Sequence, residues 1–196
     1  KTQIPPVSDA IELPSTSHLS VVDDDGNAVS MTTSVENIFG SRLMVGGFML
    51  NNQLTDFSFR PEIDGRKVAN RVQPGKRPRS SMSPTIALDA DGKLVLALGS
   101  PGGSRIIGYV TRALIAMLDW RLRPADAFAL PNHVNRNGPT DLEQGTALTA
   151  IAPGLKALGH KIRIRRITSG LHGFRATPGG YDAAADPRRE GMALGD

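Results

Sequence analysis

The chain has 196 residues, of which 39% are hydrophobic, 21% are charged and 5% are aromatic, and its formal net charge is +4. This length suits one domain, and the apolar content is sufficient for a continuous core, so a disordered or fibrous chain is excluded. Cysteine is absent, which excludes disulfides, zinc–thiolate sites and a thiol nucleophile, and no apolar run approaches the ~18 residues of a membrane-spanning helix.

The first elements predicted along the chain are an extended lead-in and a β-hairpin. Residues 1–15 contain three prolines and little periodicity, so we expect them to be extended and exposed. Residues 17–22 and 28–33 are rich in β-forming side chains, and the run of aspartates followed by Gly26 and Asn27 is typical of a turn. The two segments are therefore predicted to pair as antiparallel strands.

A second pair of strands is predicted at residues 85–88 and 93–98, on either side of a turn that contains Asp and Gly. Because residues 93–98 are apolar on both faces, we expect a central strand that is covered on both sides. A glycine-rich turn follows at residues 99–104, and apolar side chains then recur at helical spacing over residues 106–118. The sequence therefore predicts a strand, a glycine turn and a buried helix in direct succession.

The rest of the chain carries signals for one more helix and further strands. A helix is predicted over residues 124–130, with a proline in its first turn and Pro131 ending it. Residues 161–165 alternate basic and apolar side chains, as an edge strand does, and another hairpin is predicted to turn at residues 178–180. Hairpins followed by helices and more strands favour a sheet covered by helices over an all-α or all-β domain.

The positive charge is concentrated in one stretch. Residues 60–79 contain seven basic residues against two acidic ones. They contain no aromatic residue that could stack on a base, and prolines and glycines interrupt them, so we expect a basic loop and no nucleic-acid interface. The four histidines lack the spacing of metal ligands, and neither a metal nor another cofactor is expected. Arg105 is expected on a helix surface or at a subunit contact.

Several polar segments could serve a polar ligand or a reaction. Thr16 stands where the lead-in enters the first strand; its hydroxyl is compatible with a nucleophile that a base activates and equally with a structural strand residue. Gly102 and Gly103 precede the helix, where backbone N–H groups can hold an anion or a developing oxyanion; a tight strand-to-helix connection explains the same glycines. The Gly-Lys-Ser/Thr signature of a phosphate-binding loop is absent.

The order of the polar segments is more specific than any one of them. In chain order they are TSHLSVVD at 16–23, DGNAV at 25–29, FG at 39–40, LNNQ at 50–53, DFS at 56–58, KRP at 76–78, SSMSPT at 80–85, GSPGGSR at 99–105 and ADPRREG at 185–191. This order resembles the small subunit of gamma-glutamyltransferases. The resemblance covers nearly everything from Thr16 to the C-terminus.

The resemblance implies an α/β fold, the αββα sandwich of N-terminal-nucleophile hydrolases, with mostly antiparallel sheets and completed by a large subunit from the same precursor. Residues 1–15 would be a linker or tail before an autoprocessing site, and residues 16–196 the small catalytic subunit. The precursor would cut the Ser15–Thr16 bond. The freed α-amino group, with a pKa of ~7.7 to 8, could then accept the Thr16 hydroxyl proton, whereas the amide of the uncut chain cannot.

Carried over by position, the resemblance assigns a role to each of nine residues. These are Thr16 as nucleophile, Ser34 as its supporting hydroxyl, Gly102 and Gly103 as oxyanion donors, Glu36, Gln53 and Asp56 as ligands of the substrate α-amino group, and Ser80 and Ser81 as ligands of its α-carboxylate. Two departures from the family stand out. Thr55 replaces the first Asp of a pair, and residues 59–73 are short and lack the tyrosine of a lid, which predicts an open pocket with a basic rim.

The implied function is a gamma-glutamyl transferase or hydrolase of the glutathione hydrolase type, with water, an amino acid or a peptide as acceptor. Two alternatives stay open: a cephalosporin or glutaryl amide acylase with the same nucleophile, and an inactive, unprocessed relative that binds anions through residues 60–79. The sequence leaves the preferred donor and acceptor open. The resemblance favours a periplasmic or extracellular location and leaves the cytoplasm possible.

Overall fold

The computed structural model describes residues 16–195; the predicted lead-in at residues 1–15 lies outside them. The described strands are β1 (Thr16–Val22), β2 (Ala28–Ser34), β3 (Met44–Val45), β4 (Phe48–Met49), β5 (Glu62–Ile63), β6 (Arg66–Lys67), β7 (Thr85–Leu88), β8 (Leu94–Gly99), β9 (His133–Asn135), β10 (Thr140–Glu143), β11 (Ile162–Arg165), β12 (His172–Thr177) and β13 (Gly180–Ala185). The helices are η1 (Gln53–Asp56), η2 (Gly103–Arg105), α1 (Ile106–Leu118), α2 (Pro124–Ala129), η3 (Ala147–Ile151) and α3 (Ala152–Ala157).

Strands β1 and β2 form the predicted antiparallel hairpin, which extends from the pair Thr16–Ser34 to the pair Val22–Ala28. The Asp23 carboxylate closes the turn by accepting hydrogen bonds from the backbone and side chain of Asn27, each at 2.8 Å. The two faces of the hairpin are unusual in their polarity. The exposed face is apolar, with Leu19, Val21, Val29 and Met31 each 39–55% exposed, whereas hydroxyls and His18 lie on the covered face.

The central sheet has the strand order β13-β12-β8-β7, and all its pairs are antiparallel. Strand β8 lies in its interior, and its residues Leu96, Ala97 and Leu98 are fully buried, which confirms the predicted central strand. The predicted turn at 178–180 joins β12 to β13. This sheet is therefore built from strands that are up to about ninety positions apart in the chain.

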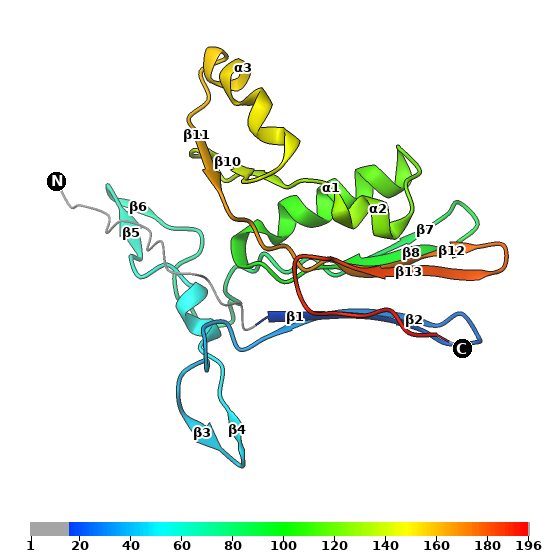
Figure 1. Cartoon of the computed structure of the whole chain (residues 1–196). Helices are drawn as coiled ribbons and strands as arrows, with labels where there is room; N and C mark the ends of the chain where they lie inside the picture. The colour runs from blue at the N-terminus through cyan, green and yellow to red at the C-terminus, as the bar shows by residue number, and fades with distance from the viewer. Residues whose placement is uncertain (1–15, 196) are drawn as a thin grey trace.

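Figure 1 shows three layers: the β1–β2 hairpin, the four-stranded sheet, and helices α1 and α2 on the other face of that sheet. The main core lies between this sheet and the helices, where Leu96, Leu98, Ile106, Met117 and Phe128 are at most 1% exposed. Helix α1 has the predicted bounds, and α2 ends one residue before the predicted Leu130. The apolar period of residues 106–118 identified the helix but only part of its buried face: Ile106 and Val110 are buried, whereas Ile107, Ile115 and Leu118 are 40–54% exposed.

The remaining elements lie outside these layers. Strand β11 is the predicted edge strand; it pairs in parallel with β10, which pairs antiparallel with β9. The hairpins β3–β4 and β5–β6 project from the layered body (Figure 1). The mixed α/β class with mostly antiparallel sheets is confirmed. Among the described residues, no helix is long and apolar enough to cross a membrane.

The predicted surface position of Arg105 is wrong. Its side chain is 7% exposed and forms an ion pair with Asp141 on β10 at 3.3 Å, and Asp141 also accepts a 2.8 Å bond from Arg163 on β11. The short helix η2 turns the chain immediately before α1, so Arg105 faces β10 instead of solvent. No local pattern indicates this contact, because its partner lies 36 residues further along the chain.

Candidate active site

The hydroxyls of Thr16 and Ser34 meet at one end of the β1–β2 hairpin. The two residues are direct partners in the strand register, and the distance between their Oγ atoms is 2.9 Å. Because residues paired across a hairpin point to the same face, both hydroxyls lie on the covered, polar face. The predicted nucleophile and its predicted supporting hydroxyl are thus brought into hydrogen-bond contact.

A backbone group holds Ser34 in turn. The N–H of Glu36 donates to the Ser34 hydroxyl oxygen at 2.8 Å. Glu36 has a φ of 74°, in the left-handed region that side chains other than glycine rarely adopt. The sharp bend after β2 therefore turns a backbone donor back onto the dyad and brings the Glu36 side chain to the neighbouring η1 segment.

The Glu36 carboxylate is held by residues around η1. Its Oε2 accepts a 2.5 Å bond from the Asn52 side-chain amide, and the Thr55 hydroxyl lies 3.4 Å from the same oxygen. Thr55 is the residue that departs from the family pattern. An aspartate at position 55 would place a second carboxylate beside that of Glu36. Thr55 has no charge, so this repulsion is absent.

Gln53 and Asp56 lie in the same η1 turn. The Gln53 amide nitrogen is 3.4 Å from the Asp56 carboxylate. The Gln53 Oε1 atom is buried and has no hydrogen-bond partner among residues 16–195. A buried acceptor without a partner costs free energy until a donor reaches it, so this atom is suited to receive an N–H from a ligand.

The glycine turn after β8 lies near the same end of the hairpin. Ser30 donates to the Leu98 carbonyl at 3.1 Å, and the His18 ring covers Gly99, where an added Cβ would lie 2.3 Å from the ring. The contact nearer Thr16 on the hairpin, that of His18, is therefore also the one further along β8, at Gly99. The glycine turn follows directly after Gly99. In Figure 1 the start of β1 and the start of α1 lie at this same end.

Gly102 and Gly103 differ in what surrounds them. Gly102 has a φ of 138°, and an added Cβ would lie 2.5 Å from the Tyr109 ring, so a side chain does not fit there. Gly103 has a φ of 56° and open space within 4 Å of the position of a Cβ. The turn therefore combines a closely packed glycine with one that a ligand can approach.

Ser80 and Ser81 are joined to the η1 segment through Asn70, a residue that the sequence analysis did not single out. The Asn70 side chain donates to the Asp56 carbonyl at 2.7 Å and accepts from the Arg79 N–H at 3.0 Å. This amide links the segment before Ser80 to the segment that carries Asp56. The only sequence signal was an amide among basic residues, which does not indicate a long-range bridge.

His18 is the titratable side chain of β1, two residues after Thr16. Its ring bonds the Thr32 hydroxyl at 2.8 Å and the Ser20 hydroxyl at 3.1 Å. Burial, with a smaller contribution from His172, lowers its pKa from 6.5 to about 4. His18 is therefore neutral at physiological pH and packs between the sheets.

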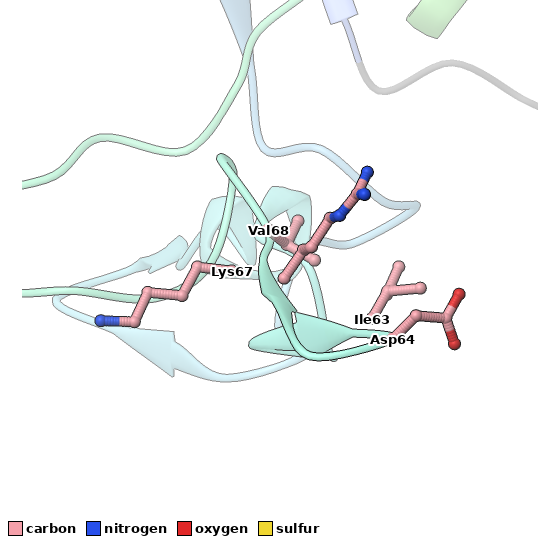
Figure 2. Close-up of a pocket in the computed structure, with 5 residues that line it drawn as sticks. Ile63, Asp64, Lys67 and Val68 are labelled. Carbon is pink, nitrogen blue, oxygen red and sulfur yellow. The ribbon is translucent and has the colours of Figure 1, made fainter.

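Figure 2 shows a surface hollow on the β5–β6 hairpin, lined by Ile63, Asp64, Arg66, Lys67 and Val68. The labelled side chains of Asp64 and Lys67 point in opposite directions. None of the nine predicted site residues lines this hollow. It belongs to the basic stretch that was predicted as a loop, in which the structure adds two short strands.

Comparison with known proteins decides the family. Residues 2–196 match the family described as gamma-glutamyltranspeptidase. The chain belongs to the gamma-glutamyltranspeptidase family. The glutathione hydrolase proenzyme of Escherichia coli (strain K12) is 39% identical over 183 residues, 88% of this chain and 31% of the relative. That of Pseudomonas aeruginosa is 35% identical over 200 residues, 96% of this chain and 36% of the relative. The chain thus spans about a third of their length.

Solved structures of the gamma-glutamyltranspeptidase family confirm the fold. The gamma-glutamyltranspeptidase from Pseudomonas nitroreducens complexed with L-DON has a TM-score of 0.80 and 34% identity, covering 91% of this chain and 98% of that chain. The cephalosporin acylase from Bacillus halodurans has a TM-score of 0.76 and 26% identity, covering 87% of this chain and 32% of that chain. The fold is the predicted N-terminal-nucleophile hydrolase sandwich.

Within this gamma-glutamyltranspeptidase chain, hydrogen bonds join several of the predicted site residues. They run from Thr16 through Ser34 to the Glu36 backbone, and from the Glu36 side chain to Asn52, beside Gln53 at the start of η1. Ser80 and Ser81 follow Arg79, which is linked to Asp56 through Asn70, and Gly102 and Gly103 follow β8. Within residues 16–195, neither pair has a hydrogen bond to Thr16. The individual roles of the nine residues stay predictions.

Proposed function

We propose that this chain is the catalytic small subunit, with linker residues before it, of a gamma-glutamyl transferase or hydrolase of the glutathione hydrolase type. The observation that carries the proposal is the 2.9 Å contact of the Thr16 and Ser34 hydroxyls, at the position where the resemblance places the nucleophile. The curated relatives are named glutathione hydrolase proenzymes, which accords with a precursor that cuts itself before Thr16. Ser15 lies outside the described residues.

Cleavage of the Ser15–Thr16 bond creates the base that the hydroxyl needs. The peptide nitrogen becomes an amine with a pKa of ~7.7 to 8, whose neutral form accepts the Thr16 hydroxyl proton. Ser34, held by the Glu36 N–H, offers a hydroxyl bond that orients the Thr16 oxygen. Nucleophile and base then belong to one residue.

The reaction proceeds through two acyl transfers. The Thr16 oxygen attacks the gamma-carbonyl carbon, and the backbone N–H groups of Gly102 and Gly103 stabilise the negative oxygen of the tetrahedral intermediate. The carbon–nitrogen bond breaks, the leaving amine takes the proton held by the α-amino group, and an ester to Thr16 remains. Water or the amine of an acceptor then attacks the ester, returns a proton to Thr16 and releases glutamate or a new gamma-glutamyl amide.

In the proposed complex, hydrogen-bond acceptors would bind the α-ammonium group of the donor substrate, and hydrogen-bond donors would bind its α-carboxylate. The carboxylates of Glu36 and Asp56 and the buried Gln53 Oε1 are acceptors, which suits an ammonium group. The hydroxyls of Ser80 and Ser81 are donors, which suits a carboxylate. The buried, unpaired Gln53 Oε1, in the same turn as the Asp56 carboxylate, is the local feature that favours an α-amino acid over an acyl group without an ammonium.

The large subunit of the same precursor is the proposed partner. Leu19, Val21, Val29 and Met31 form an apolar face of the β1–β2 hairpin that no described element covers. A two-stranded sheet with one exposed apolar face is marginal alone and needs further strands and a covering layer. The αββα sandwich supplies both when a second subunit extends the hairpin sheet and covers it.

The proposal is tested with the full precursor and its Thr16→Ala variant. We expect the wild-type precursor to yield a new N-terminus at Thr16 and to hydrolyse a gamma-glutamyl anilide, and Thr16→Ala to do neither. Thr33→Val is the matched control, because Thr33 is exposed on the opposite face of β2. A wild-type precursor that never cuts before Thr16, and that binds polyanions in a salt-sensitive way, would instead support the unprocessed anion-binding relative.

A second candidate function is an acylase that acts on cephalosporin or glutaryl side chains. It is favoured by the fold shared with the Bacillus halodurans cephalosporin acylase and by the short segment at residues 59–73. Rates on a gamma-glutamyl anilide and a glutaryl anilide separate the two functions, since the substrates differ only in the α-amino group. A preference for the glutaryl compound would assign the acylase activity.

A periplasmic or extracellular location is proposed on the family resemblance alone. Fractionation of cells that express the native full-length gene, with detection of the small subunit, tests it. Recovery of the subunit with cytoplasmic markers would contradict it.

A further inference from the structure

Asn52 joins the bend after β2 to η1 through both ends of its side chain. Its amide nitrogen donates to Glu36 Oε2 at 2.5 Å and to the Thr55 hydroxyl oxygen at 3.1 Å. Its amide oxygen accepts from the Asn37 N–H at 3.0 Å. Its backbone N–H donates to the Val35 carbonyl at 3.2 Å. One residue thus contacts three successive positions of the bend.

These bonds determine how the Asn52 amide is oriented. A carboxylate oxygen and a backbone N–H lie on its two sides, so the nitrogen must face Glu36 and the oxygen must face Asn37. An aspartate there would place a second negative charge against Glu36, and a side chain without polar atoms would remove the donor. The asparagine side chain carries both a donor for the Glu36 carboxylate and an acceptor for the Asn37 N–H, so it can form both hydrogen bonds at once.

Of Asn52 and Thr55, which both contact the Glu36 carboxylate, Asn52 is the closer, at 2.5 Å against 3.4 Å. The Thr55 hydroxyl has one hydrogen, and it lies at 2.8 Å from the Asn52 carbonyl but 3.4 Å from Glu36. The shorter bond takes that hydrogen, which leaves the Asn52 amide to hold the carboxylate. The strained backbone of Glu36, with a φ of 74°, persists only when such contacts over-determine it.

We propose that Asn52 is a positioning residue for donor selectivity: it holds the Glu36 carboxylate where the α-ammonium of an amino-acid donor binds, and so raises the preference for gamma-glutamyl over glutaryl donors. The inference rests on the proposed function. Asn52 does not touch the reacting atoms and acts through Glu36. Its effect is therefore expected in the ratio of kcat/KM for the gamma-glutamyl donor to that for the glutaryl donor, more than in the rate of acyl transfer itself.

The test uses the mature two-subunit enzyme and compares kcat/KM for a gamma-glutamyl anilide with that for a glutaryl anilide. We expect Asn52→Ala to lower the ratio at least tenfold, mainly through KM for the gamma-glutamyl donor, since a hydrogen bond to a charged group contributes the equivalent of a ten- to hundredfold change. In a Glu36→Ala background, Asn52→Ala should change the ratio less than twofold, because the carboxylate it acts through is gone.

Two further variants complete the design. Asn37→Ala is the matched control: Asn37 lies on the same bend, but its side chain bonds the Ile38 N–H, so the ratio should stay at the wild-type value. Asn52→Ser keeps a residue type favoured immediately before a helical turn, but its hydroxyl is too short to reach Glu36. It should mature and still lose selectivity if Asn52→Ala does not fold.

The outcomes separate the two proposals. Equal losses on both donors, an unchanged ratio, or loss of maturation in both Asn52 variants while Glu36→Ala matures would each overturn the positioning role and leave the proposed function standing. A wild-type enzyme that is properly cut but hydrolyses neither anilide would instead refute the proposed function.

Discussion

At the scale of single residues, two hydroxyls and one strained residue form the candidate site. The register pair Thr16–Ser34 brings the Oγ atoms to 2.9 Å, and the bend at Glu36 adds a backbone donor to Ser34. A strand threonine alone is unremarkable, since β-branched residues favour strands. Its register partner and the bend that follows make this one a candidate nucleophile.

His18 makes the stability of the hairpin depend on pH. Its folded pKa of about 4 lies below the unfolded value of 6.5, so the unfolded chain binds more protons between these values and stability falls as pH drops from 6.5 to 4. Among residues 16–195, no acidic side chain offsets this effect, and the His172 ring also opposes a positive charge on His18. Between pH 6.5 and pH 4 we expect the free energy of unfolding to fall by about 2 kcal/mol, a value reduced to allow for solvent screening.

The measurement is the apparent melting temperature of the mature enzyme at pH 7 and pH 4.5. His18→Gln should flatten the difference between the two values. The exposed His160 serves as control, and His160→Gln should keep the wild-type difference. An equal pH dependence in wild type and His18→Gln would contradict the assignment.

At the scale of elements, the stacking of the hairpin on β8 positions the glycine turn. The polar face of β1 and β2 packs on the central sheet through Ser30, which bonds the Leu98 carbonyl, and through His18, which covers Gly99. This contact leaves no room for a side chain on β8 at residue 99. The glycine there is required by the neighbouring layer and not by its own backbone conformation.

Gly99→Ala is therefore expected to lower stability by about 2 kcal/mol, because the added methyl group would lie 2.3 Å from the His18 ring and must displace it. Activity should fall with it, since the turn with Gly102 follows directly. Gly154→Ala in α3 is the matched control: its Cβ meets nothing within 4 Å, and alanine favours the helix. Chemical denaturation of both variants gives the comparison, and equal stabilities would count against the stacking argument.

At the scale of the whole molecule, Arg188 ties distant parts of the chain together. It forms ion pairs with Glu143 on β10 at 2.6 Å and with Asp186 at 3.1 Å, and its side chain is only 14% exposed. It also donates to the carbonyls of Phe128 and Leu130 at the end of α2, each at 2.9 Å. One guanidinium thus joins β10, α2 and the C-terminal segment.

Removing this group should be costly. Arg188→Met removes the cation that forms ion pairs with the buried carboxylates of Glu143 and Asp186, and breaking a buried ion pair in this way typically lowers the unfolding free energy by about 3 to 5 kcal/mol. Arg123→Met is the control, since the Arg123–Asp182 pair is exposed and should barely affect the melting temperature. Similar melting temperatures for the two variants would refute the structural role of the Arg188 network.

Local patterns were enough to predict the β1–β2 hairpin, the central strand β8, helices α1 and α2 and the edge strand β11, and to recognise the ordered motifs that indicate the family. Periods of two and 3.6 and the turn residues carry this information within a few positions. The contacts between distant segments, such as Arg105 with Asp141, Asn70 with Asp56, and Asn52 with Glu36, became visible in the folded structure alone. These depend on where the layers bring the chain together, and no local pattern records which side chains will meet there.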